Sequence, residues 1–423
     1  MKFFNSFKNI FFIINLYFFS ERFFGFIHGA NSNNKYLSIE EKFDEKIIFN
    51  FENLFSKIIG NGSSVSFAAG RMAFFALLQA ISIKKGDEII LLGSTCSVMA
   101  NAVIRCGAIP VYSDIDIDTF GSEVKSIKIK ITSKTKVIVA QHSFGIPCDI
   151  QPIVDLAKKE GIFLVEDCAL TLGSMINNKK VGTFGDAAIF SFDHSKPLNL
   201  LLGGIVYTED NILLKKIKDI QNNSHHLSNE KIKIIYRQLY FENKYCNPKF
   251  FPKYLILNRF KRLKYSLEED FNSKKNETKY PYPAKLPTFL AQYGIYLLGI
   301  WQNTERTRVE NLKLLITFFK NTKYSKYLPK SYFSASRYIV PLRFVWSQPD
   351  GDIERKRLSK LLHVEWTWFL KPIISTNRPL NKFYYNIGDS PISENIGKGM
   401  VNVPCNLSTE ETKILIEKFN NLI

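Results

Sequence analysis

Residues 161–208 read GIFLVEDCALTLGSMINNKKVGTFGDAAIFSFDHSKPLNLLLGGIVYT, and this stretch decides the fold. It holds two apolar runs: residues 162–165, followed by Glu166 and Asp167, and residues 187–192, which end shortly before Lys196. Short apolar runs bounded by glycine and charge are typical of buried strands in an α/β sheet. Because open α/β sheets bind ligands at the carboxyl ends of their strands, we expect Asp167 and Lys196 to lie at a binding site.

A lysine and an aspartate in this arrangement predict a particular cofactor. A lysine amine can form an imine with an aldehyde, and a fixed carboxylate can keep a pyridine nitrogen protonated. A protonated pyridine ring is the electron sink of pyridoxal phosphate chemistry. The stretch therefore predicts a pyridoxal phosphate site in which Lys196 and Asp167 take these two roles.

A phosphate site is predicted earlier in the chain. Residues 65–69 are typical of a strand, Gly70 of a turn, and residues 71–83 of an apolar helix. The free N–H groups and the dipole at the start of such a helix attract phosphate. A plain tight turn is the alternative interpretation, and the presence of Lys196 favours the phosphate site.

Four segments together resemble the DegT/StrS-like family of sugar aminotransferases, which are pyridoxal phosphate enzymes of the aspartate-aminotransferase fold (fold type I). They are AAGRMAFFAL (68–77), GDEIILLGSTCSVMANAVIRCGAIPVYSDID (86–116), HSFGIPCDI (142–150) and residues 161–208. The resemblance covers about residues 64–208 and returns near the C-terminus. It implies a large α/β domain with a mostly parallel seven-stranded sheet in a three-layer α/β/α arrangement, followed by a smaller α+β C-terminal domain.

The resemblance also implies roles for single residues. Lys196 would bind the cofactor covalently and shuttle protons, and Asp167 would hold the proton on the ring nitrogen. The cofactor phosphate would be held mostly by backbone and hydroxyl groups of Gly70, Arg71, Met72 and Ser191. Some relatives carry histidine in place of the lysine and dehydrate their substrate, so the lysine favours transamination. His142 would line the cofactor pocket or have only a structural role.

Three positions differ from the family pattern. Cys96 stands where an aromatic residue often stacks on the cofactor ring, and Leu170 stands where Gln or His often contacts the ring hydroxyl. Residues 280–294 (YPYPAKLPTFLAQYG) carry prolines where the family has an Asn that reaches the partner subunit. These differences motivate an alternative, a catalytically impaired scaffold or membrane-associated binding protein. Retention of both Asp167 and Lys196 argues against that alternative, because each is costly without a cofactor.

Composition sets wider limits on function. The chain has 423 residues, 57 basic and 39 acidic, and a formal net charge of +18, which favours phosphate-bearing partners or reflects an AT-rich genome. Its six cysteines lack paired CxxC spacing, so we predict no metal site, no disulfide framework and a cytoplasmic location. The cysteines are Cys96, Cys106, Cys148, Cys168, Cys246 and Cys405.

Two segments suggest contact with a membrane. In residues 1–30, Phe and Ile recur on one helical face, which is typical of an interfacial amphipathic helix or of a helix packed on protein. Residues 244–264 combine Lys and Arg with aromatic and apolar residues, which suits an anionic membrane or a solvated insertion packed on the core. No nucleic-acid-binding motif accompanies this charge, so we rank membrane above nucleic acid.

We predict five parts of the chain. They are the N-terminal segment (1–30), the cofactor-binding α/β domain (31–221), a basic and aromatic insertion (222–280), bridging helices (281–320) and the small α+β domain (321–423). Further predictions are helices at 40–51, 95–105 and 353–362, a strand at 338–344, and a terminal helix capped by Ser408 and Glu411. Trp366, Trp368 and Lys371 fall where the family often contacts substrate.

The sequence thus predicts a pyridoxal-phosphate-dependent transaminase. It would move an amino group, with glutamate as the expected donor, onto a keto sugar carried on a nucleotide or lipid, for surface polysaccharide or amino-sugar biosynthesis. The resemblance implies a homodimer. Peripheral membrane contact through residues 1–27 and 244–264 is a further expectation, at the inner face of the membrane.

Overall fold

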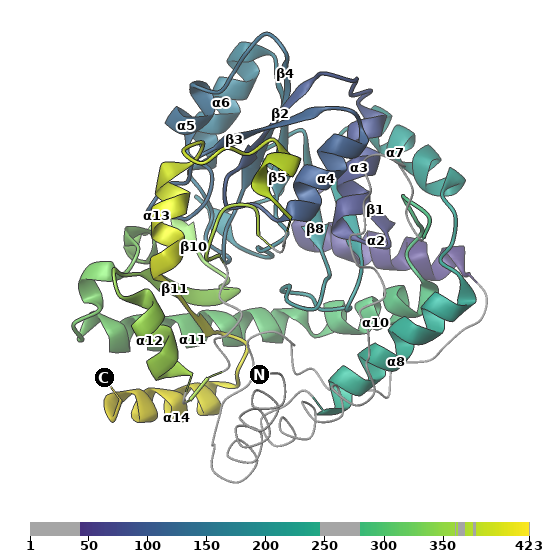
Figure 1. Cartoon of the computed structure of the whole chain (residues 1–423). Helices are drawn as coiled ribbons and strands as arrows, with labels where there is room; N and C mark the ends of the chain where they lie inside the picture. Colours follow the sequence, from purple (N-terminus) through teal and green to yellow (C-terminus); the bar gives the residue numbers. More distant parts are fainter. Residues whose placement is uncertain (1–42, 246–279, 360, 363–368, 375–377, 423) are drawn as a thin grey trace, which may run out of the picture.

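The computed structural model describes residues 43–245, 280–359, 361–362, 369–374 and 378–422 (Figure 1). At its centre lies one seven-stranded sheet with the order β1-β9-β8-β5-β4-β2-β3. The strands are β1 (Ser63–Phe67), β2 (Glu88–Leu92), β3 (Ile109–Ser113), β4 (Thr135–Gln141), β5 (Phe163–Asp167), β8 (Ala187–Ser191) and β9 (Gly204–Thr208). Strands β3, β2, β4, β5 and β8 run parallel, and β9 runs antiparallel to both β8 and β1. The predicted mostly parallel sheet is confirmed.

Helices cover both faces of this sheet, as the alternation of side chains along β2 shows. Ile89 and Leu91 pack in the core that includes helices α3 (Gly70–Ala80) and α4 (Ser97–Arg105). Ile90, between them, packs in a separate core with α5 (Val124–Lys128) and α6 (Ile150–Glu160). Because successive side chains of a strand point to opposite faces, these two cores define the three layers (Figure 1).

Further helices extend the first core. They are α2 (Glu45–Ile59), α7 (Asn211–Asn223), α8 (Asn229–Tyr245) and α10 (Thr288–Gly299). The bounds predicted for α2, residues 40–51, are wrong, because the Asp44 side chain caps the helix by accepting from the N–H groups of Lys46 and Ile47. Phe55 of α2 then packs edge-on against Phe190 and Phe192 at the end of β8. Ile235 and Leu239 of α8 belong to the same core.

The C-terminal part forms a second core around an antiparallel strand pair, β11 (Arg343–Ser347) and β12 (Met400–Pro404). Its helices are α11 (Trp301–Lys320), α12 (Gly351–Leu358), α13 (Pro391–Gly399) and α14 (Thr409–Asn420). The capping box of Ser408 and Glu411 at the start of α14 is confirmed. This part has the α+β character that the sequence predicts.

The strand predicted over residues 338–344 is wrong. The chain there splits into β10 (Arg337–Tyr338) and β11, with Pro341, which has no backbone N–H, between them. β10 pairs with β6 (Met175–Ile176), which pairs in turn with β7 (Lys179–Lys180). The predicted helices at 95–105 and 353–362 are also corrected: α4 begins at Ser97 and α12 ends at Leu358.

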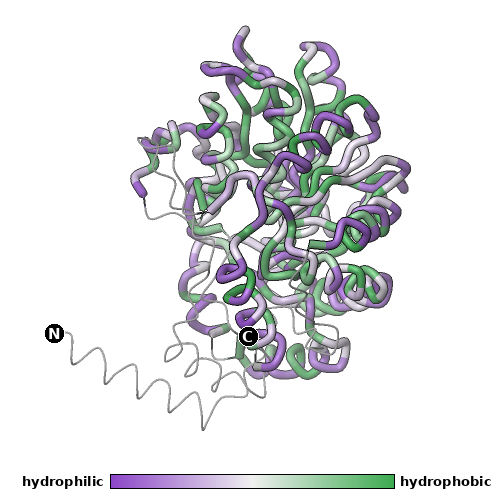
Figure 2. Tube along the Cα trace, turned by 90° about the vertical axis from the view of Figure 1, so that its right-hand side faces the viewer, coloured by the Kyte–Doolittle hydropathy of each residue, from purple (hydrophilic) through white to green (hydrophobic). Residues whose placement is uncertain are grey.

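Hydrophilic stretches lie along the outer helices and loops (Figure 2). None of the helices in the described ranges is long and apolar enough to span a bilayer. The N-terminal segment 1–30, residues 246–264 of the basic segment, and Trp366 and Trp368 lie outside the described residues.

Candidate active site

Lys196 lies in the turn after β8, at the carboxyl edge of the sheet. Its backbone N–H donates to the Asp193 carbonyl oxygen at 3.0 Å, which closes the turn. Burial lowers the pKa of the Lys196 amine. The negative charge of Asp193 is the largest influence opposing this shift, and Cys96 and Asp167 also oppose it. A lowered pKa enlarges the fraction of free amine, which is the form that reacts with an aldehyde.

Asp167 is the last residue of β5, the strand next to β8. It is 4% exposed, and among the described residues its carboxylate accepts one hydrogen bond, from the Ala169 N–H at 2.9 Å. Burial raises the pKa of Asp167, while the Ala169 hydrogen bond and the charge of Lys196 oppose the rise. Because a buried carboxylate is costly without a partner, this strand end suits a positively charged ligand group.

The turn predicted to bind phosphate lies beside the end of β8. A Cβ atom on Gly70, the first residue of α3, would lie 3.0 Å from the Ser191 Cβ and 3.2 Å from its Oγ. A Cβ atom on Gly204 would lie only 2.2 Å from the Gly70 Cα, so β9 and the start of α3 meet backbone to backbone. The structure therefore brings a helix N-terminus and a hydroxyl together, and such groups can hold phosphate.

The side chains of Arg71 and Met72 contact the segment before α10. The Arg71 Nη2 donates to the Tyr280 hydroxyl at 3.2 Å, and the Ala284 N–H donates to the Met72 sulfur at 3.4 Å. The Met72 N–H donates to the Ala69 carbonyl at 3.0 Å. This backbone donor is thus used inside the first turn of α3, and the fully buried Met72 side chain packs in the core.

Cys96 and Leu170, the two residues that differ from the family pattern, both lie between Met72 and Ser191 in the sequence. Cys96 is the partly exposed N-cap residue of α4, forms an isolated bridge with Ile374, and interacts electrostatically with Lys196. Leu170 is 4% exposed, three residues after Asp167, and belongs to none of the three apolar cores of the described residues.

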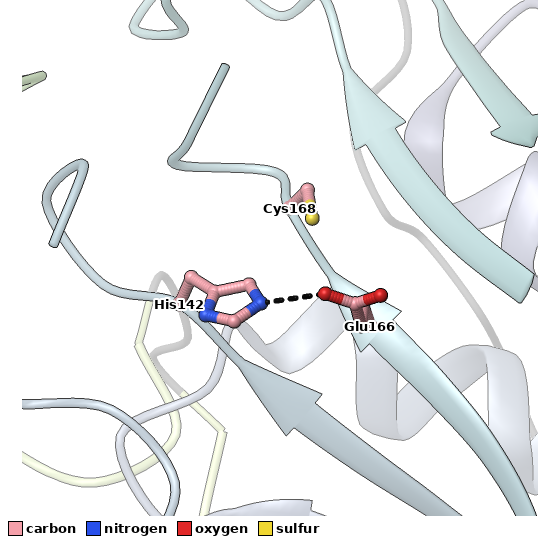
Figure 3. A group of neighbouring side chains, drawn as sticks. All are labelled: His142, Glu166 and Cys168. Carbon is pink, nitrogen blue, oxygen red and sulfur yellow. Dashed lines mark hydrogen bonds and ion pairs between the residues drawn. The ribbon is translucent and has the colours of Figure 1, made fainter. Parts of the chain in front are cut away.

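His142 and Glu166 form a buried pair beside Asp167 (Figure 3). The His142 Nε2 lies 3.1 Å from the Glu166 Oε2, and the Cys148 N–H donates to Nδ1 at 3.1 Å. Since Nδ1 accepts that bond, the neutral imidazole carries its proton on Nε2 and donates it to Glu166. The Glu166 carboxylate also accepts from the N–H groups of Gly182, Phe184 and Gly185.

This pair is part of a group with the spacing of a metal site. One ligand atom each from His142, Glu166 and Cys168 lies within 4.8 Å of the others, and all three residues are buried. Both imidazole nitrogens already have partners, and the carboxylate already accepts four hydrogen bonds. We therefore interpret the group as a structural network. Of the two roles predicted for His142, this interpretation favours the structural one.

Several residues near Lys196 were not predicted. Asp193 and His194 lie three and two residues before it in the chain, and these polar side chains were a usable signal. Arg343, the first residue of β11, acts electrostatically on Lys196 and had no signal, because only tertiary folding brings β11 there. It is 4% exposed, its Nη1 donates to the Asn402 Oδ1 at 3.1 Å, and burial lowers its pKa to about 9.

Lys371, which the sequence predicts as a substrate contact, is exposed.

Comparison with known proteins shows a sequence similarity in the N-terminal half of the chain. Residues 44–244 match the model of the DegT/DnrJ/EryC1/StrS aminotransferase family. The chain is 36% identical over 177 residues to GDP-perosamine synthase of Vibrio cholerae, which covers 42% of this chain and 48% of that protein. It is 35% identical over 183 residues to dTDP-3-amino-3,6-dideoxy-alpha-D-galactopyranose transaminase of Aneurinibacillus thermoaerophilus, covering 43% and 50%. The chain spans about half the length of the curated relatives it matches.

Solved structures share the fold over a longer range. DesV of S. venezuelae, solved in complex with a ketimine intermediate, aligns with a TM-score of 0.66 and 18% identity, covering 91% of this chain and 90% of that one. The aminotransferase from Psychrobacter cryohalolentis aligns with a TM-score of 0.65 and 20% identity, covering 91% and 99%. Residues 44–244 are thus similar in sequence to the DegT/DnrJ/EryC1/StrS aminotransferase family, and the fold agrees with that of solved aminotransferases along most of the chain.

Proposed function

We propose that this protein is a pyridoxal-phosphate-dependent aminotransferase that transfers an amino group to a keto sugar carried on a nucleotide. The observation that carries the proposal is the meeting of Lys196 with Asp167 at the ends of two adjacent parallel strands, where the two charges act on each other. The similar proteins named above, a GDP-perosamine synthase and a dTDP-sugar transaminase, support the sugar substrate.

The residues present fit pyridoxal phosphate. The buried Asp167 carboxylate, with its single hydrogen bond among the described residues, suits a protonated ring nitrogen. The close approach of Gly70 to Ser191 leaves little room for a Cβ atom and suits a phosphate held by backbone N–H groups and a hydroxyl. When bound, the cofactor would supply an electron sink for cleavage of a bond at the amino-bearing carbon.

Each residue then has a defined task. Lys196 would attach the cofactor and, once released, hold and move a proton at Nζ, helped by its lowered pKa. Asp167 would keep the ring nitrogen protonated through its charge. Gly70 and Arg71 would bind phosphate through backbone N–H groups and Ser191 through its hydroxyl, with Met72 supporting the turn by packing.

Cys96 and Leu170 would contact the cofactor ring in place of the family's aromatic and hydrogen-bonding residues. A thiol is polarisable and a leucine is apolar, so both can pack on a ring, with less contact area than an aromatic side chain gives. We therefore propose weaker retention of the cofactor than in relatives with both groups, and Leu170→Gln should tighten it.

We further propose glutamate as the amino donor, a lipid as the alternative carrier of the keto sugar, and a homodimer as the working form. Peripheral membrane contact stays a prediction, because residues 1–27 and most of 244–264 lie outside the described residues.

An absorbance titration tests the proposal. The full chain is mixed with pyridoxal phosphate, and Lys196→Ala is compared with Lys136→Ala, which removes an exposed lysine at β4. We expect a visible band in the wild type and in Lys136→Ala, loss of the band in Lys196→Ala, and bleaching by glutamate. If no band appears in the wild type, the proposal fails and the non-catalytic scaffold takes its place.

A further inference from the structure

The turn that holds Lys196 carries a second acidic residue, Asp193, to which the proposed function gives no task. Its Oδ1 accepts two hydrogen bonds from His194, one from the backbone N–H and one from Nδ1, both at 2.6 Å. The Lys196 N–H donates to the Asp193 carbonyl oxygen at 3.0 Å, so the side chains of Asp193 and Lys196 both project from one hydrogen-bonded turn. Two bonds to one oxygen fix the orientation of the carboxylate.

The charges around this turn come from several elements. Asp193 and His194 lie in the turn itself, Cys96 at the start of α4, Asp167 at the end of β5 and Arg343 at the start of β11. The Glu242 carboxylate, from α8, acts on His194. Among the described residues, the Asp193 and Asp167 carboxylates both act on Lys196, and Asp193 is fixed within the turn that holds the lysine.

The electrostatic shifts agree with this geometry. Burial raises the pKa of Asp193, but His194 and Lys196 outweigh burial and the net pKa is lowered, so the carboxylate is charged at neutral pH. Burial lowers the pKa of His194, while Asp193 and Glu242 outweigh it and raise the net pKa. The Asp193 and His194 side chains are 35% and 31% exposed, so water screens the attraction and keeps its effect on Lys196 moderate.

We propose that Asp193 is a positioning residue for Lys196: its carboxylate, locked by His194, is the counter-ion that holds the lysine side chain in place at the site. The proposal rests on the proposed function only in taking Lys196 as the reacting lysine. A lysine side chain carries about 2 kcal/mol of rotamer entropy. A fixed counter-ion restricts that freedom, so that the amine stays near the end of β5 whether or not it is bonded to a cofactor.

Titration of the Lys196 amine in the protein without cofactor tests this proposal. The protein is labelled with acetic anhydride over a range of pH, and the labelled fraction of the Lys196 peptide is measured by mass spectrometry against the exposed Lys136. For Asp193→Asn we expect the midpoint to fall by about one pH unit, which gives up to about tenfold more reactive amine below both midpoints.

Two variants serve as controls. Asp193→Glu keeps the charge and should return the midpoint toward the wild-type value, whereas Asp155→Asn, at an exposed position of α6, should leave it unchanged. An Asp193→Asn midpoint equal to that of wild type, or an Asp193→Glu midpoint as low as that of Asp193→Asn, would overturn the proposal. If circular dichroism shows that Asp193→Asn does not fold, Asp193→Ser removes the same charge with a smaller side chain.

The labelling experiment separates this proposal from the proposed function. It needs no cofactor and no turnover, so a shifted midpoint supports the role of Asp193 even if pyridoxal phosphate gives no band. A cofactor band with an unshifted midpoint supports the aminotransferase and removes Asp193 from its site.

Discussion

Glu166 and Asp167 are neighbours in the chain, yet strand alternation gives them opposite surroundings. The Glu166 carboxylate accepts from His142 and from three backbone N–H groups, so its charge is compensated within the protein. The Asp167 carboxylate accepts from Ala169 alone among the described residues, and burial raises its pKa. The first carboxylate stabilises the fold, and the second holds a charge that the proposed cofactor would compensate.

Replacing Asp167 should therefore stabilise the protein without cofactor while weakening cofactor binding. A raised pKa in the folded state means that the native protein binds the proton more readily than the unfolded chain. The carboxylate consequently costs stability as pH rises from the ordinary value of about 3.9 through the raised folded value. Asp167→Asn keeps an oxygen for the Ala169 N–H and removes this cost.

Urea unfolding at several pH values measures this effect. The free energy of unfolding of Asp167→Asn should exceed that of wild type at pH 7, and the two should converge at acid pH. Pyridoxal phosphate should stabilise wild type more than the variant. A variant that is less stable than wild type at pH 7 would contradict the interpretation.

Helices α13 and α14 differ in how their N-termini are capped. At α14, Ser408 accepts from the Glu411 N–H, and the Glu411 carboxylate accepts from the Ser408 N–H, all within one turn. At α13, the carboxylate of Asp114 accepts from Ile392 N–H at 2.6 Å and from Ser393 N–H at 2.8 Å. Asp114 follows strand β3, 278 positions before Ile392, so this cap joins the C-terminal part to the edge of the central sheet.

The two caps should differ in strength. Ser408→Ala removes an exposed local cap and should lower the free energy of unfolding by about 1 kcal/mol. Asp114→Ala removes a buried carboxylate acceptor and leaves the N–H groups of Ile392 and Ser393 without it, so we expect the free energy of unfolding to fall by about 2–3 kcal/mol. Urea denaturation of both variants measures the two losses in the free energy of unfolding. A loss for Asp114→Ala no larger than that for Ser408→Ala would show that the long-range cap contributes little to stability.

At the scale of the whole molecule, the second apolar core contains residues from both parts of the chain. Phe144, in the loop after β4, packs edge-on to Phe120 at 5.8 Å and stacks on Phe369 at 6.1 Å. Its carbonyl accepts from the Leu342 N–H at 2.8 Å, just before β11. Phe144 thus belongs to the same cluster as Trp346 of β11, and we expect the two parts to unfold together.

Phe144→Ala tests this cooperativity. The loss of a fully buried ring should lower the free energy of unfolding by about 3–5 kcal/mol. Far-ultraviolet circular dichroism and tryptophan fluorescence should still report a single shared transition. Phe49→Ala, at a position of α2 that is 64% exposed, should change the stability by less than about 0.5 kcal/mol. Two separate transitions in Phe144→Ala would show that the parts unfold independently.

The sequence by itself determined the strands of the central sheet and the placing of Lys196 and Asp167 at strand ends, because strand patterning and glycine turns are local signals. It also determined the Ser408 cap, whose partner is three residues away. Only the tertiary structure decided that Gly70 lies against Ser191, that the Met72 side chain packs in the core, and that Arg343 acts electrostatically on Lys196. These contacts join residues more than a hundred positions apart, or depend on which face a helix buries, and no local pattern encodes either.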